Sequence, residues 1–103
     1  DEYVRCLRDP MTFHGICEDY RASATIDMEL DKADRERIIQ VPILALWGKD
    51  GVVGKLWDVI SGWQERAANV EGLAVAECGH FVPEEQPEVV LEALLKFLAK
   101  YPG

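Results

Sequence analysis

The sequence of 103 residues predicts an α/β fold with a parallel sheet. Two apolar runs, residues 41–47 and 73–76, are each followed by a segment in which apolar residues recur at helical spacing. An apolar run without polar alternation is typical of a strand that helices cover on both faces. Because the order is strand, helix, strand, helix, we expect a βαβ unit with parallel strands and a right-handed connection.

Residues 1–40 predict helices and no strand, since their apolar residues have irregular three-to-four spacing. Pro10 can open a helix, because the first N–H of a helix has no partner within it. Residues 25–27 interrupt the pattern, and residues 31–39 form a short, charge-rich helical stretch. We therefore expect two or three short helices and a change of domain near residue 40.

The elements after residue 40 have clearer limits. The first apolar run ends at Gly48, and the helix after it is closed by Asn69 and Gly72. One face of that helix carries Leu56, Val59, Ile60, Trp63 and Ala67. The last helix begins at Pro87 and runs to about Tyr101. Its predicted buried stripe consists of Leu91, Leu94, Leu95 and Leu98.

Two parallel strands that are buried on both faces are not stable alone, because each leaves a backbone edge unpaired. We therefore expect further strands, supplied by an upstream part of the same polypeptide rather than by a partner chain. The first residue is Asp and not Met, which indicates a processed, trimmed or fragmentary chain.

Composition excludes several classes of partner. A formal net charge of -8 and the absence of any Lys/Arg run argue against nucleic acid and anionic membranes. No apolar stretch is long enough to span a bilayer, and no apolar signal segment follows Asp1. The three cysteines lack zinc-site spacing and are most simply free thiols in a reducing compartment. We expect a cytoplasmic protein.

The candidate catalytic residue is His80, which follows the second apolar run and a turn-forming glycine. Parallel sheets build active sites at the carboxyl ends of their strands, and an imidazole titrates near neutral pH. Position alone leaves a catalytic role and a structural loop role equally open. A Cys78–His80 nucleophile pair is disfavoured.

The segment Gly-His-Phe-Val-Pro-Glu-Glu at 79–85, with Pro87, Glu88 and a terminal helix, resembles the end of α/β-hydrolases of the epoxide hydrolase and haloalkane dehalogenase group. Residues 42–48 resemble the penultimate strand of that family. The resemblance implies that residues 1–40 are the end of a helical cap and its return connection. Residues 41–103 would be the last two parallel strands and flanking helices of the core, with His80 as general base.

The acid that supports such a histidine usually follows Trp-Gly by three residues, and here that position holds Gly51. Asp50 lies one residue early, so it is either the acid in a remodelled loop or a solvated turn residue. Fluoroacetate (haloacetate) dehalogenases resemble this sequence here, because they take the acid from an earlier strand. Residues 17–27 also resemble their cap, which implies that Tyr20 binds the departing halide. Without the resemblance, Tyr20 is a half-buried packing residue.

The resemblance thus implies a haloacetate dehalogenase with no metal or organic cofactor, a small haloacid as substrate, and a homodimer at full length. An aspartate nucleophile outside this chain would form an ester, which water activated by His80 would hydrolyse. The alternatives are an epoxide hydrolase, a serine esterase of the same fold, or an inactive truncated fragment. Glu84 and Glu85 are expected to complement the amino-terminal end of the last helix.

Overall fold

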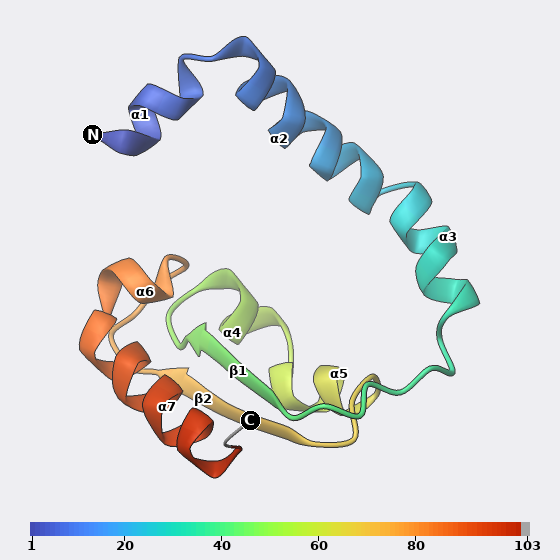
Figure 1. Cartoon of the computed structure of the whole chain (residues 1–103), viewed down its shortest axis with the longest axis vertical. Helices are drawn as coiled ribbons and strands as arrows, with labels where there is room; N and C mark the ends of the chain where they lie inside the picture. The colour runs from blue at the N-terminus through green and yellow to red at the C-terminus, as the bar shows by residue number, and fades with distance from the viewer. Residues whose placement is uncertain (102–103) are drawn as a thin grey trace. The chain divides into compact units, whose positions relative to one another are not determined.

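The computed structural model describes residues 1–101 and divides the chain into two compact units, Asp1–Glu36 and Arg37–Gly103 (Figure 1). The described residues of the first unit form helices only, and both strands belong to the second unit. The division falls close to the change of character expected near residue 40. That residues 1–40 are a cap remains a prediction.

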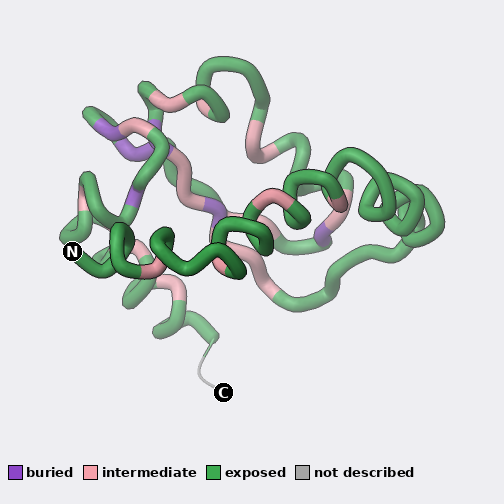
Figure 2. Tube along the Cα trace, turned by 90° about the horizontal axis from the view of Figure 1, so that it is seen from above, coloured by how far each residue is buried: buried purple, intermediate pink, exposed green. Residues whose placement is uncertain are grey.

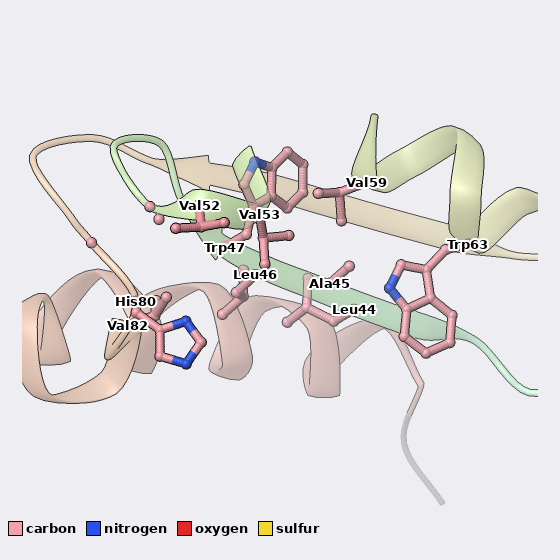
Figure 3. A pocket seen from close by; sticks show the side chains of 13 residues that line it. Leu44, Ala45, Leu46, Trp47, Val52, Val53, Val59, Trp63, His80 and Val82 are labelled. Carbon is pink, nitrogen blue, oxygen red and sulfur yellow. The ribbon is translucent and has the colours of Figure 1, made fainter. Parts of the chain in front are cut away.

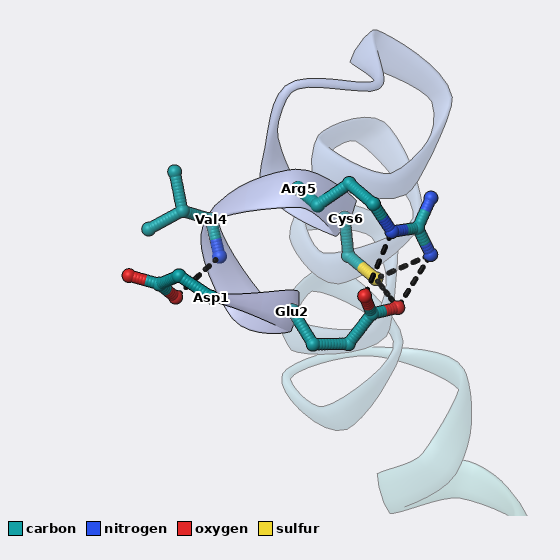
Figure 4. Close-up of polar contacts among 5 residues, drawn as sticks. All are labelled: Asp1, Glu2, Val4, Arg5 and Cys6. Carbon is teal, nitrogen blue, oxygen red and sulfur yellow. Dashed lines mark hydrogen bonds and ion pairs between the residues drawn. The ribbon is translucent and has the colours of Figure 1, made fainter.

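The first unit contains α1 (Glu2–Leu7), α2 (Pro10–Ser23) and α3 (Ile26–Ala33), so the prediction of two or three short helices is confirmed. Aspartates begin the first two helices. The Asp1 carboxylate accepts a hydrogen bond from the Val4 amide (Figure 4). The Asp9 carboxylate accepts one from the Met11 amide at 2.8 Å. Pro10 is the first residue of α2, as expected.

Only the first three residues of the charge-rich segment 31–39 are helical, which corrects the prediction of a helix over the whole segment. Helix α3 begins at Ile26 and ends at Ala33. Ile39 instead forms an isolated parallel bridge with Ala67, in which its amide donates to the Arg66 carbonyl at 2.9 Å. The charges of this segment gave no signal of that pairing, because backbone groups make it.

The second unit is built on β1 (Ile43–Gly48) and β2 (Val70–Val75), which pair in parallel from Ile43 opposite Val70 to Gly48 opposite Val75. The predicted parallel pair is therefore confirmed. The single helix expected between the strands is instead two, α4 (Val52–Leu56) and α5 (Val59–Gln64), because Trp57 has extended backbone angles.

Gly72 lies inside β2, opposite Ala45, and does not end a helix as predicted. A Cβ at this position would lie 2.9 Å from the ring of Trp47 and would also meet the Ile60 side chain. Glycine is therefore required here by the close packing of side chains over the strand, not by a turn.

The chain ends in α6 (Val82–Glu85), which was not predicted, and α7 (Pro87–Lys100), which was. The buried stripe of α7 differs from the prediction. The leucines expected to be buried are between 42% and 58% exposed: Leu91, Leu94, Leu95 and Leu98. The half-buried residues are Val90, Ala93 and Phe97, on a neighbouring face of the helix. At its end, Lys100 pairs with Glu71 of β2.

Few residues of the described chain are buried (Figure 2). The buried apolar residues are Ala45, Ala67, Val75, Cys78 and Val82. The prediction that both strands are buried on both faces is therefore wrong within this chain, since Leu73 of β2 is 42% exposed. No helix within residues 1–101 is both long and apolar enough to cross a membrane.

Candidate active site

The candidate site lies where the two parallel strands end, because the loops that leave β1 and β2 contact each other there. The Lys49 amide donates to the Val75 carbonyl at 2.8 Å, and the Asp50 amide donates to the Cys78 carbonyl at 3.0 Å. The β1 loop carries Asp50, and the β2 loop carries His80. Backbone hydrogen bonds therefore hold together the two loops that carry the predicted site residues Asp50 and His80.

Glycines allow this close approach. A Cβ on Gly48 would overlap the Gly79 carbonyl oxygen and lie 2.7 Å from its carbonyl carbon. A Cβ on Gly51 would lie 3.0 Å from the same oxygen. An acid at position 51, where the resembled family usually has one, would thus crowd the backbone that precedes the histidine. The glycine at that position is explained by the packing of the two loops.

His80 is farther from its strand than the sequence suggested. Strand β2 ends at Val75, and a turn at 76–77 separates it from the histidine. Glu77 adopts a φ of 50°, in the left-handed region that side chains rarely occupy. Because Ala76 is apolar, the sequence pattern placed the end of the strand one residue too late. The imidazole itself is exposed, with an edge-on contact to Phe81 at a ring-centroid distance of 5.1 Å.

Glu85, expected only to complement a helix end, makes specific contacts to the histidine loop. Its carboxylate accepts a hydrogen bond from the Gly79 amide at 2.5 Å and another from the Phe81 amide at 3.0 Å. These are the amides of the residues on either side of His80. The Gln86 side chain donates to the Glu77 carbonyl at 3.1 Å and ties down the start of the loop.

Cys78 is buried, at 1% exposed, within the small core formed with Val75 and Val82. Burial raises the pKa of its thiol, and the negative charges of Glu85 and Asp50 raise it further. A nucleophilic cysteine needs a lowered pKa and access to substrate. Cys78 therefore has the properties of a core residue, and a Cys–His nucleophile pair is excluded on chemical grounds.

A cavity of about 380 Å³ opens beside His80 along β1 (Figure 3). Apart from His80, the cavity is lined by glycines and by residues with mainly apolar side chains: Leu44, Ala45, Leu46, Trp47, Gly48, Gly51, Val52, Val53, Val59, Trp63, Gly79 and Val82. An imidazole at the edge of an apolar cavity can act on a bound water or substrate while bulk water is partly excluded.

The two other predicted site residues are placed differently. Asp50 lies near the site, but within the described chain no hydrogen bond or ion pair joins its carboxylate to His80. Tyr20 lies in α2 of the first unit and is 75% exposed. It is therefore not the half-buried packing residue that position alone suggested. Residues 1–101 contain no cluster of three or more His, Cys, Asp or Glu arranged to hold a metal ion.

No protein-family model matches the sequence. Among curated proteins, the chain is 38% identical over 99 residues to a fluoroacetate dehalogenase from Burkholderia sp., covering 96% of this chain and 32% of that protein. It is 42% identical over 99 residues to a soluble epoxide hydrolase from Corynebacterium sp. (strain C12), covering 95% and 32%. The chain thus spans about a third of the length of these relatives.

The solved structures that match are also about three times as long as this chain. A candidate acyltransferase from Salmonella enterica matches with a TM-score of 0.91 and 47% identity, over 96% of this chain and 33% of that one. A candidate α/β hydrolase from Nostoc sp. matches with a TM-score of 0.89 and 48% identity, over 94% and 33%. A candidate epoxide hydrolase from Pseudomonas aeruginosa, solved with bound MFA, matches with a TM-score of 0.84 and 40% identity, over 95% and 33%.

Proposed function

Because this chain belongs to the α/β-hydrolase superfamily and matches the carboxy-terminal part of its fold, we propose that it supplies the general base, His80, of a haloacetate dehalogenase. The observation that carries the proposal is the position of His80. It lies on a tethered loop at the carboxyl end of a parallel strand, beside an apolar cavity. The sequence likeness to a fluoroacetate dehalogenase supports the substrate class.

The proposed reaction has two steps. A carboxylate oxygen of an aspartate, supplied by polypeptide upstream of this chain, attacks the α-carbon of a haloacid. The carbon–halogen bond breaks, and the halide leaves with its electron pair. His80 then takes a proton from water, whose oxygen attacks the ester carbonyl. The bond from the carbonyl carbon to the ester oxygen breaks, and protonated His80 gives its proton to the departing oxygen, which releases the hydroxyacid. The aspartic acid formed loses its proton to solvent, which regenerates the carboxylate. Neither step requires a metal or an organic cofactor.

Tyr20 is proposed to donate a hydrogen bond to the departing halide. A phenol hydroxyl suits this role because it is a neutral donor that strengthens as charge develops on the leaving atom. The acid that orients His80 is proposed to come from upstream, since Asp50 makes no bond to the imidazole within residues 1–101. Cytoplasmic localisation and a full-length homodimer belong to the same proposal.

An epoxide hydrolase is the second candidate, because a soluble epoxide hydrolase is 42% identical to this chain. It would use the same ester chemistry and the same histidine. The two functions differ in the group that leaves: an epoxide oxygen needs a proton, whereas a halide needs only hydrogen-bond donors. A serine esterase would differ in its nucleophile.

The test is halide release from fluoroacetate and chloroacetate by the complete enzyme, with His80→Ala as the variant. We expect the wild type to turn over continuously. The variant should release about one halide per active site and then stop as an ester, seen as a mass increase on the protein. Turnover of epoxides or simple esters without halide release would show that the substrate class is wrong. Halide turnover by the variant at the wild-type rate would show that His80 is not the base.

A further inference from the structure

We propose that Glu85 is a positioning residue for His80: its carboxylate fixes the histidine loop, so that the imidazole is held ready for the ester-hydrolysis step. This inference rests on the proposed function, because it assigns the step in which His80 acts. It adds to that function a residue for which helix-end electrostatics predicted no chemical role.

Two hydrogen bonds join the Glu85 side chain to the backbone of the histidine loop. The two carboxylate oxygens of Glu85 accept from the amides of Gly79 and Phe81, at 2.5 and 3.0 Å. His80 is the residue between them, so a single side chain bridges the backbone on both sides of the histidine. Hydrogen bonds to an ionised acceptor are shorter and about twice as strong as neutral ones. The bridge therefore restricts the backbone angles that aim the imidazole.

Gly79 lies close to the Glu85 carboxylate. A Cβ there would lie 3.1 Å from both carboxylate oxygens of Glu85. A side chain at position 79 would therefore push the carboxylate a few tenths of an ångström away from the two amides. Gly79 thus allows the close approach of Glu85 to the histidine loop.

The backbone of Glu85 is itself anchored to the histidine loop. The Phe81 carbonyl accepts the Glu85 amide at 2.9 Å, so the backbone of Glu85 is also bonded to the loop that its side chain bridges. Val82, at the start of α6, is 9% exposed and belongs to the core cluster. The carboxylate therefore acts from a fixed base and not from a mobile surface segment.

The experiment compares the two chemical steps in Glu85→Gln of the complete enzyme. The amide side chain keeps the size of glutamate but replaces one acceptor oxygen with a donor, so it cannot accept from both backbone amides. Rapid-quench measurement of the first halide released gives the rate of ester formation, and intact-protein mass gives the rate of ester loss. We expect ester hydrolysis to slow by roughly tenfold to a hundredfold, the usual cost of a misplaced catalytic group, with ester formation within about threefold of wild type.

Glu88→Gln is the matched control, because Glu88 lies at the start of α7 and has no hydrogen bond or ion pair within residues 1–101. It should leave both rates unchanged. A purely structural role for Glu85 would slow both steps equally, and that result overturns the proposal.

Two further variants separate the possible failures. If His80→Ala accumulates ester while Glu85→Gln hydrolyses it at the wild-type rate, the role of Glu85 is wrong and the proposed function stands. If His80→Ala accumulates no ester, the proposed function itself fails. Should Glu85→Gln not fold, Gly79→Ala displaces the carboxylate by a different route and is expected to slow the same step. Ester hydrolysis at the wild-type rate in Gly79→Ala would overturn the proposal.

Discussion

At the scale of single residues, the site depends on glycines where two loops meet. The backbone of Gly79 packs against Gly48 and Gly51, and the carboxylate of Glu85 packs against Gly79. Each contact is possible because a Cβ is absent. The same local chemistry accounts for the missing acid at position 51, which family resemblance treated only as a departure from a pattern.

Gly48→Ala is expected to destabilise the complete enzyme by about 1–3 kcal/mol or more, because the added Cβ would overlap the Gly79 carbonyl oxygen and the backbone must move. The measurement is urea unfolding followed by circular dichroism. Gly62→Ala is the control, since nothing lies within 4 Å of a Cβ there and the residue is in α5. That substitution should stabilise by about 0.5–1 kcal/mol. Equal effects from both variants would contradict the packing of the loops described here.

At the scale of elements, the sequence predicted strand order, parallel pairing and the last helix, because these follow from apolar runs and helical spacing. It failed where one type of residue can serve two structures. Ala76 extended an apolar run past the end of β2, and Gly72 was taken as a helix end although it packs under Trp47. Within this chain, α7 packs with a face next to the predicted leucine stripe, since two adjacent faces of that helix are apolar.

The candidate site was predictable to a similar extent. His80 was predicted from its position after an apolar run and from resemblance, and its catalytic role stays a prediction. The role of Glu85 was missed, because a carboxylate that accepts backbone amides leaves no pattern in the sequence. The only signals were the glycine at 79 and the six-residue spacing from Gly79 to Glu85, which have no meaning until the turn is known.

The packed face of α7 can be tested by Phe97→Ala. Phe97 is half-buried and lies beside Leu44 and Leu73 of the two strands around a shared cavity. We expect a loss of about 1–3 kcal/mol in the complete enzyme, less than the cost of a fully buried phenylalanine. Lys96→Ala is the control. Its ammonium is exposed and, within residues 1–101, pairs with Glu92 one turn earlier, so the change should stay within about 0.5 kcal/mol. A larger loss for Lys96→Ala would reverse the assignment of the faces.

At the scale of the whole molecule, the described residues bury too little to account for a stable fold. Five apolar residues are buried, and two of them are alanines. Large side chains remain exposed, among them Trp57 at 62% and Leu95 at 58%. Exposed apolar surface of this kind marks regions that other protein covers. This agrees with a chain that spans about a third of its relatives.

We therefore expect the 103-residue chain alone to unfold without cooperativity and to aggregate as its concentration rises. Dye binding to exposed apolar surface and light scattering measure this directly, with the complete enzyme as the reference. A soluble monomer that unfolds in one sharp transition would contradict the expectation, and with it the inference that further strands complete the sheet.

The bridge made by Glu85 also has a kinetic meaning. It joins residues six positions apart, whereas pairing of β1 with β2 joins Ile43 to Val70. The entropy lost on closing a short loop is smaller, and such contacts form sooner. The turn that presents the histidine can thus take shape before the sheet does. In hydrogen exchange under native conditions, the amides of Gly79 and Phe81 should exchange more slowly in the wild type than in Glu85→Gln, because each loses its carboxylate acceptor in the variant.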